Sequence, residues 1–122
     1  MAADLDRQTL RTLADVADLS KPRLVEHFLY VPSHEAGEQA AQELASRGYA
    51  SNVRESADDE GGFPPWLVLA SQTAVVNAES VREARELFEG LAERHGGVYD
   101  GWGAEADEEP PPSKGWRRLF GR

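Results

Sequence analysis

Of the side chains in this sequence, the three histidines are the first candidates for metal binding or catalysis. His27 lies in an apolar stretch, His34 follows a Pro-Ser pair, and His95 ends a helical pattern. There is no helical pair and no paired carboxylate at the spacing of metal ligands. We therefore expect no metal site and no cofactor.

A catalytic site would need these histidines to act with other polar groups. A hydrolase could combine His27 with Asp100 and a serine, but the sequence has no GxSxG turn to present a nucleophile. Glu26 and His27 are neighbours on a predicted strand, so they point to opposite faces and cannot act as a pair. The glycine pairs lack the lysine and the spacing of phosphate-binding loops. We predict that the protein is not an enzyme.

Length and charge narrow the class of protein further. The 122 residues suffice for one domain with a core, and the chain has no cysteine. The formal net charge is -9, and residues 1–104 hold 18 acidic and 9 basic side chains. Such a surface repels phosphate backbones and attracts basic partners, so we expect no direct nucleic-acid binding. No apolar run reaches the roughly 20 residues of a membrane span, and we expect a cytoplasmic protein.

Hydrophobic periodicity predicts seven elements. They are a helix over 4–19, a strand over 23–31, a helix over 33–48, strands over 49–56 and 66–70, a helix from Asn77 or Ser80 to His95, and a strand over 98–103. After the first helix the order is that of a split βαβ, or ferredoxin-like, α+β fold. It predicts a four-stranded antiparallel sheet with two helices and an extra N-terminal helix. The strands over 23–31 and 66–70 are the most apolar and should be central. The first has the composition of a strand buried on both faces, although one of Glu26 and His27 should face a polar or open side of the sheet.

The stretch from Gly96 to Gly103 closes this domain. Gly96 and Gly97 supply the backbone that ends a helix, and the last strand follows at once. Gly101 and Gly103 indicate a bulge, or a place where another backbone or a partner approaches closely. We expect Tyr99 and Trp102 to contribute first to stability, with at least one ring substantially buried.

Four segments of the chain form a recognisable combination: VEHFLY, an alanine-rich helix ending in RGY, WLVLA, and ERHGGVYDGWG. This combination resembles the ribonuclease E inhibitor family called regulator of ribonuclease activity B (RraB), over about residues 5–106. The resemblance implies a ferredoxin-like domain without catalytic activity. It also implies a protein partner, an endoribonuclease of the ribonuclease E type, whose cleavage of RNA the domain lowers by binding a non-catalytic region.

The resemblance also supplies candidate site residues. The positions that match the family motif are Glu26, His27, Tyr99, Asp100, Gly101, Trp102 and Gly103. None of them has a catalytic role in the family. We take the five that are not glycine as candidate partner contacts, and Gly96, Gly97, Gly101 and Gly103 as structural positions.

The sequence divides into a domain over 1–106 and a tail over 107–122. The tail passes from acidic residues through three prolines to a basic-aromatic end, which departs from the acidic tails of the family. One interpretation is a disordered end, or a strip that folds back on the acidic domain. The other is a docking motif that becomes helical on a partner protein or on an anionic membrane surface, of which the four basic residues favour the protein. Its candidate contacts are Trp116, Arg117, Arg118, Leu119 and Phe120.

Two alternatives to ribonuclease regulation remain open. Ferredoxin-like sheets can bind metabolites on an open face, which would make the protein a small-ligand sensor. The protein could also be a general interaction adaptor that docks through its C-terminal motif.

Overall fold

The computed structural model of the chain describes residues 2–15, 18–56, 63–105 and 118–121. Its elements follow in the order α1 (Ala2–Ala14), β1 (Arg23–Val31), α2 (His34–Ala45), β2 (Ala50–Glu55), β3 (Trp66–Ala74), α3 (Ala78–His95), β4 (Val98–Glu105) and β5 (Arg118–Gly121). The order through β4 is the predicted one. The α+β class with an additional N-terminal helix is confirmed.

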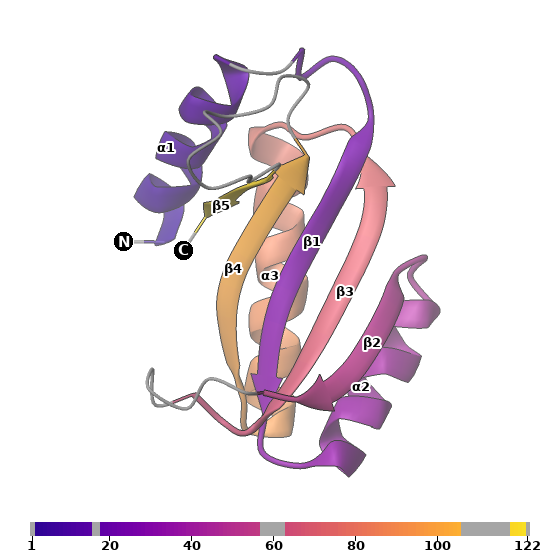
Figure 1. Ribbon diagram of the computed structural model, residues 1–122. Coiled ribbons are helices and arrows are strands. Elements are labelled where there is room, and N and C mark those ends of the chain that lie inside the picture. Colours follow the sequence, from indigo (N-terminus) through magenta and orange to yellow (C-terminus); the bar gives the residue numbers. More distant parts are fainter. Residues whose placement is uncertain (1, 16–17, 57–62, 106–117, 122) are drawn as a thin grey trace.

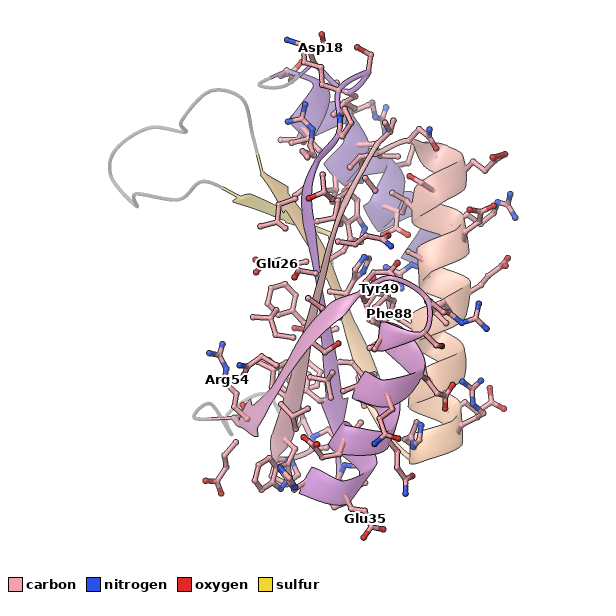
Figure 2. All side chains as sticks on the ribbon, turned by 90° about the vertical axis from the view of Figure 1, so that its right-hand side faces the viewer. Asp18, Glu26, Glu35, Tyr49, Arg54 and Phe88 are labelled. Carbon is pink, nitrogen blue, oxygen red and sulfur yellow. The ribbon has the colours of Figure 1, made fainter. Side chains whose placement is uncertain are left out.

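The strands form one antiparallel sheet in the order β2-β3-β1-β4-β5. The four strands of the ferredoxin-like pattern are present, and β1 and β3 lie between β2 and β4 as predicted. Helices α2 and α3 pack on one face of the sheet, while α1 lies beside the β4 edge (Figure 1). In the side view no described helix covers the other face, toward which Glu26 points (Figure 2).

The two faces of β1 differ more than the sequence indicated. Burial alternates strictly along the strand, so that every second side chain is buried and those between are half-buried. Val25, Leu29 and Val31 belong to the core, whereas Glu26 and Phe28 lie on the face without helices. The prediction that the strand is buried on both faces was therefore wrong, whereas the expectation that one of Glu26 and His27 faces an open side of the sheet is confirmed (Figure 2). The cause is the layer arrangement, because all the described helices leave that second face uncovered.

The core has two neighbouring parts. The first lies beneath α2 and α3 and contains Leu29, Val31, Ala40, Leu44, Val68, Ala70, Phe88, Leu91 and Ala92. The second lies beneath α1 and contains Leu13, Val25, Val76, Val81, Trp102 and Ala104. The N-terminal helix therefore extends the hydrophobic layer to cover the end of β4.

Local signals place the ends of α3. Asn77 is the N-cap, and it exchanges hydrogen bonds with Ser80 in a capping box. The alternative start at Ser80 is wrong, because Ser80 lies in the first turn of the helix. At the other end Gly96 has φ 69° and the Gly97 N–H donates to the Ala92 carbonyl oxygen at 2.7 Å. A Cβ at Gly97 would collide with the backbone oxygen of Tyr30, so both glycines of this pair have a structural reason.

A β-bulge in β4 decides where its aromatic side chains point. The register with β1 shifts between Phe28 and Leu29, so that Phe28 pairs with Gly101 while Leu29 pairs with Tyr99. Gly101 has φ 120°, a conformation that side chains disfavour. Without the shift, Tyr99 and Trp102 would point to opposite faces, because strand side chains alternate. The bulge predicted at Gly101 is confirmed, and it turns both rings toward the helices.

Four residues of the tail agree with the interpretation of a strip that folds back on the domain. Residues 118–121 form β5, which pairs with the outer edge of β4 in the register Gly121 to Trp102 and Arg118 to Glu105. An uncovered edge strand presents free backbone donors and acceptors, which favour pairing with a nearby extended segment. The helical docking form is not seen for these four residues, and the rest of the tail lies outside the described residues.

The bulge gives a prediction about stability. The change Gly101→Ala puts a Cβ on a residue at φ 120° and should lower the free energy of unfolding by about 1–3 kcal/mol. The matched change Gly90→Ala lies in the interior of α3, where the new Cβ meets only the end of Arg94 at 3.4 Å, and should raise it by up to about 1 kcal/mol. Urea unfolding measures both. Equal effects of the two variants would show that backbone conformation at Gly101 is not the constraint.

Candidate functional site

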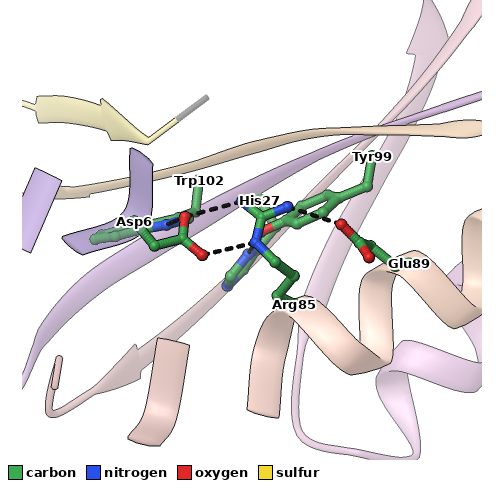
Figure 3. A network of polar contacts seen from close by, with 6 residues as sticks. All are labelled: Asp6, His27, Arg85, Glu89, Tyr99 and Trp102. Atoms are coloured by element: carbon green, nitrogen blue, oxygen red, sulfur yellow. Dashed lines mark hydrogen bonds and ion pairs between the residues drawn. The ribbon is translucent and has the colours of Figure 1, made fainter. Parts of the chain in front are cut away.

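A buried carboxylate lies beneath the Tyr-Asp-Gly-Trp motif of β4. The carboxylate belongs to Asp6 of α1, and it accepts two hydrogen bonds from Arg85 of α3, from Nε at 2.6 Å and from Nη2 at 2.9 Å. It accepts a third from the indole Nε1 of Trp102 at 2.9 Å (Figure 3). Trp102 is only 1% exposed, which confirms that at least one aromatic ring of the motif is buried. One carboxylate thus joins α1, α3 and β4.

Arg85 extends this network toward the surface. Its Nη1 donates to Glu89 Oε2 at 2.9 Å, and the guanidinium carbon lies 5.0 Å from the centre of the Tyr99 ring. The hydrogen bond to Asp6 raises the pKa of Arg85 above its usual range, so the side chain stays charged. The guanidinium charge therefore interacts with one buried acid, one exposed acid and the face of an aromatic ring.

His27 is the uncharged part of the same network. Its Nδ1 lies 2.9 Å from the Tyr99 hydroxyl, and its ring stacks on Phe88 at a centroid distance of 4.3 Å. Burial, together with the nearby positive charge of Arg85, lowers the pKa of His27 to about 3. Burial also raises the pKa of Tyr99. Both groups are neutral near pH 7, and the hydrogen bond between them joins two uncharged side chains.

The structure separates the residues that the resemblance grouped. It brings His27, Tyr99 and Trp102 together beneath the helices, where His27 is 4% exposed. Glu26 and Asp100 are half-buried, and Glu26 points to the opposite face of the sheet (Figure 2). The fold therefore does not place these residues on one shared surface. Their part in partner binding stays a prediction.

The remaining candidates have different positions. Gly96 and Gly97 end α3, Gly101 forms the bulge, and Gly103 pairs with Glu26 on one side and with Phe120 on the other. The tail candidates Arg118, Leu119 and Phe120 belong to β5. Trp116 and Arg117 lie outside the described residues.

Sequence reasoning missed the two charged residues at the centre of the network. Charged side chains are expected on the solvent face of an amphipathic helix, yet the Arg85 side chain is only 15% exposed. The spacing of Val81, Arg85 and Phe88 places the arginine on the buried side of the helix, and this was the available signal. Asp6 gave no such signal, because its partners are far away in the sequence.

A cleft between α1 and α3 connects the network with solvent. Its volume is about 510 Å³, and its floor includes Asp6 and Arg85. The other lining residues are Arg7, Leu10, Ala78, Glu79, Val81, Arg82, Glu86 and Glu89. The lining mixes both signs of charge with apolar side chains, so it does not select one class of ligand by charge.

Within the described parts of the chain, no group of three or more His, Asp or Glu side chains could hold a metal ion. None of the described helices has the length and hydrophobicity needed to cross a bilayer.

The carboxylate network predicts a large effect of a small substitution. Asp6→Asn keeps the size of the side chain but removes the charge that compensates Arg85, and should lower the free energy of unfolding by about 3 kcal/mol or more. The control Glu89→Gln removes the other acid of the same guanidinium, which is 55% exposed, and should cost less than about 1 kcal/mol. Urea unfolding of both variants measures the difference. Equal losses of unfolding free energy in the two variants would mean that the buried ion pair stabilises the fold no more than the exposed one.

His27 predicts a dependence of stability on pH. The unfolded chain takes up a proton near pH 6.5, whereas folded His27 does so only near pH 3. Stability should therefore fall by about 1.4 kcal/mol per pH unit as the pH is lowered through this window, and the group contributes no slope above it. The variant His27→Gln should lose this part of the slope while the titrations of the carboxylates remain. Identical slopes for both proteins between about pH 6 and 4.5 would show that folded His27 is protonated as readily as in the unfolded chain.

Comparison with known proteins connects this arrangement with a family. A family model described as regulator of ribonuclease activity B matches residues 3–104. The regulator of ribonuclease activity B of Actinobacillus succinogenes is 26% identical over 102 residues, which cover 80% of this chain and 72% of that protein. The protein of the same name from Haemophilus influenzae is 27% identical over 105 residues, covering 83% and 69%.

A third relative has a higher identity over a shorter stretch. The regulator of ribonuclease activity B of Proteus mirabilis is 32% identical over 91 residues, which cover 75% of this chain and 64% of that protein. The family match contains α1 from Ala3 onward, the whole network of Asp6, and β4 up to Ala104. By this match, the chain belongs to the regulator of ribonuclease activity B family.

Proposed function

We propose that the protein is a non-catalytic regulator that binds an endoribonuclease of the ribonuclease E type in the cytoplasm and slows its cleavage of RNA. The observation that carries this proposal is the family match over residues 3–104. The family and the named relatives are regulators of ribonuclease activity. The ribonuclease E type itself rests on the resemblance of the Tyr-Asp-Gly-Trp-Gly segment.

The state of His27 supports the non-catalytic part of the proposal. A general base works best with a pKa near the working pH, whereas the pKa of His27 is lowered to about 3. Its imidazole is stacked on Phe88 and hydrogen-bonded to Tyr99, so it lies among side chains of the core. His27, the histidine considered for a catalytic role, thus has a structural role.

The outer surface of α3 supports binding to a basic protein surface. Its exposed acidic residues are Glu79, Glu83, Glu86, Glu89 and Glu93, while its exposed basic residues are Arg82 and Arg94. The net charge of -9 has the same sign. Complementary charge speeds association and selects partners, so we propose that the ribonuclease docks on this helix.

A cleavage assay tests the proposal. A purified ribonuclease of the ribonuclease E type should cut RNA more slowly as the concentration of this protein rises, until the rate reaches a plateau. The variant with Glu83→Lys and Glu93→Lys should require about tenfold more protein for the same inhibition, because both changes invert charges on the exposed side of α3. The difference should shrink at high salt.

A matched variant controls for net charge. Asp15→Lys and Glu55→Lys change the total charge by the same amount at two exposed positions outside α3, and should inhibit like the unchanged protein. Unchanged cleavage at a saturating amount of the unchanged protein would refute the proposed function. Equal weakening of both variants would instead refute α3 as the docking surface.

A further inference from the structure

The outer edge of β4 is occupied by a segment from outside the family domain. The family match ends at residue 104, and within it β4 is the last strand of the order β2-β3-β1-β4. The strand that covers this edge is β5, residues 118–121. An edge strand is a ready template for pairing with a further extended segment. The free protein therefore fills the edge of its own domain with its C-terminal segment.

The edge is part of a slot with two walls. One wall is β4, where Gly103 and Ala104 pair in register with Phe120 and Leu119. The other wall is α1, which contacts β5 directly and lies beside it (Figure 1). Helix α1 is in turn held against α3 and β4 by the carboxylate of Asp6. The second wall is thus fixed by the buried network and does not depend on β5 alone.

The covering strand is short and its composition is distinctive. β5 has four residues, Arg-Leu-Phe-Gly, and the chain from Lys114 to Arg122 has four basic residues and no acidic one. The two walls of the slot, α1 and β4, together carry four acidic and two basic residues. The register places the position of Arg118 opposite that of Glu105. A basic, apolar segment therefore complements this slot in charge.

We infer that the slot between β4 and α1 is a binding site for an extended segment of a partner protein, with a basic residue followed by apolar ones. The segment adds to the sheet as a strand antiparallel to β4, in the place that β5 takes in the free protein. Backbone hydrogen bonds supply affinity in this mode of recognition, and side chains supply selectivity. Residues 118–121 then act as an internal competitor. The inference goes beyond the proposed function, because it does not depend on which protein supplies the segment.

Tethering explains how so short a strand holds the slot. β4 and β5 belong to one chain, so their pairing is intramolecular, and intramolecular pairing of this kind has an effective concentration of about millimolar. A segment of another protein can displace β5 only if it binds the slot more tightly than β5 does or is present at a comparable local concentration. Weakening β5 should therefore open the site to an added peptide.

The test uses the full chain and a labelled synthetic peptide with the sequence of residues 113–122, SKGWRRLFGR. The variant with Leu119→Pro and Phe120→Pro cannot pair β5 regularly, because proline lacks the backbone N–H. It should bind the peptide at least about tenfold more tightly than the unchanged chain, since the tethered competitor is lost. Backbone amide signals of residues 102–105 should shift on binding. The melting temperature of the variant checks that the domain remains folded.

Two control peptides define the chemistry of the occupant. A peptide with the same two prolines should not bind, and a peptide with Arg117→Glu and Arg118→Glu should bind at least about tenfold more weakly. If the unchanged chain and the proline variant bind the original peptide equally, or if neither binds it at about 1 mM, the slot is not such a site. Amide shifts confined to residues other than 102–105 would likewise show that the peptide does not bind in the slot.

A second measurement covers a variant that fails to fold. Excess peptide added to the unchanged chain should move the amide signals of residues 118–121 while the amides of residues 102–105 keep their protection from solvent exchange. Loss of that protection would overturn the inference. Dimers of the unchanged chain that the proline variant does not form would also overturn it, because they would assign the edge to a second copy of this chain.

Discussion

The carboxylate of Asp6 joins three parts of the chain that lie far apart in sequence. It receives two hydrogen bonds from Arg85 of α3 and one from Trp102 of β4. Removing a carboxylate and a guanidinium from water costs free energy, and only good geometry with further hydrogen bonds offsets this cost. The arrangement therefore tolerates one placement of α1 relative to the sheet. The second part of the core, with Leu13 and Val76, depends on that placement.

The network in turn depends on the bulge of β4. Tyr99 must face His27, and Trp102 must face Asp6, although three residues apart on a regular strand point to opposite faces. The extra residue at the bulge restores the shared direction, and Gly101 provides the φ of 120° that it needs. The order Tyr-Asp-Gly-Trp therefore allows both aromatic rings to pack under the helices. Tyr99 and Trp102 of this motif thus belong to the interior of the domain.

The elements that sequence reasoning placed are those whose signals are local. Arg23–Val31 was predicted with its observed bounds, because a run of apolar residues follows a proline and precedes another. Asn77 and Gly96 mark the ends of α3 by their own conformations. By contrast, the partners of Asp6 come from 79 and 96 residues further along the chain, and no local pattern reports such a contact. The strand β5 could not be predicted either, since it depends on an edge that exists only after the sheet has formed.

With its aromatic residues in the core, the motif leaves recognition to the surfaces that it positions. Arg85, which binds Asp6 inside, lies on the same helix as the exposed acids Glu83 and Glu86 outside. Helix α1, held by that same carboxylate, forms one wall of the slot that contains β5. The buried network thus fixes the spacing between an acidic helix surface and a strand edge. A partner that contacts both meets them in a preorganised arrangement, which lowers the entropic cost of binding.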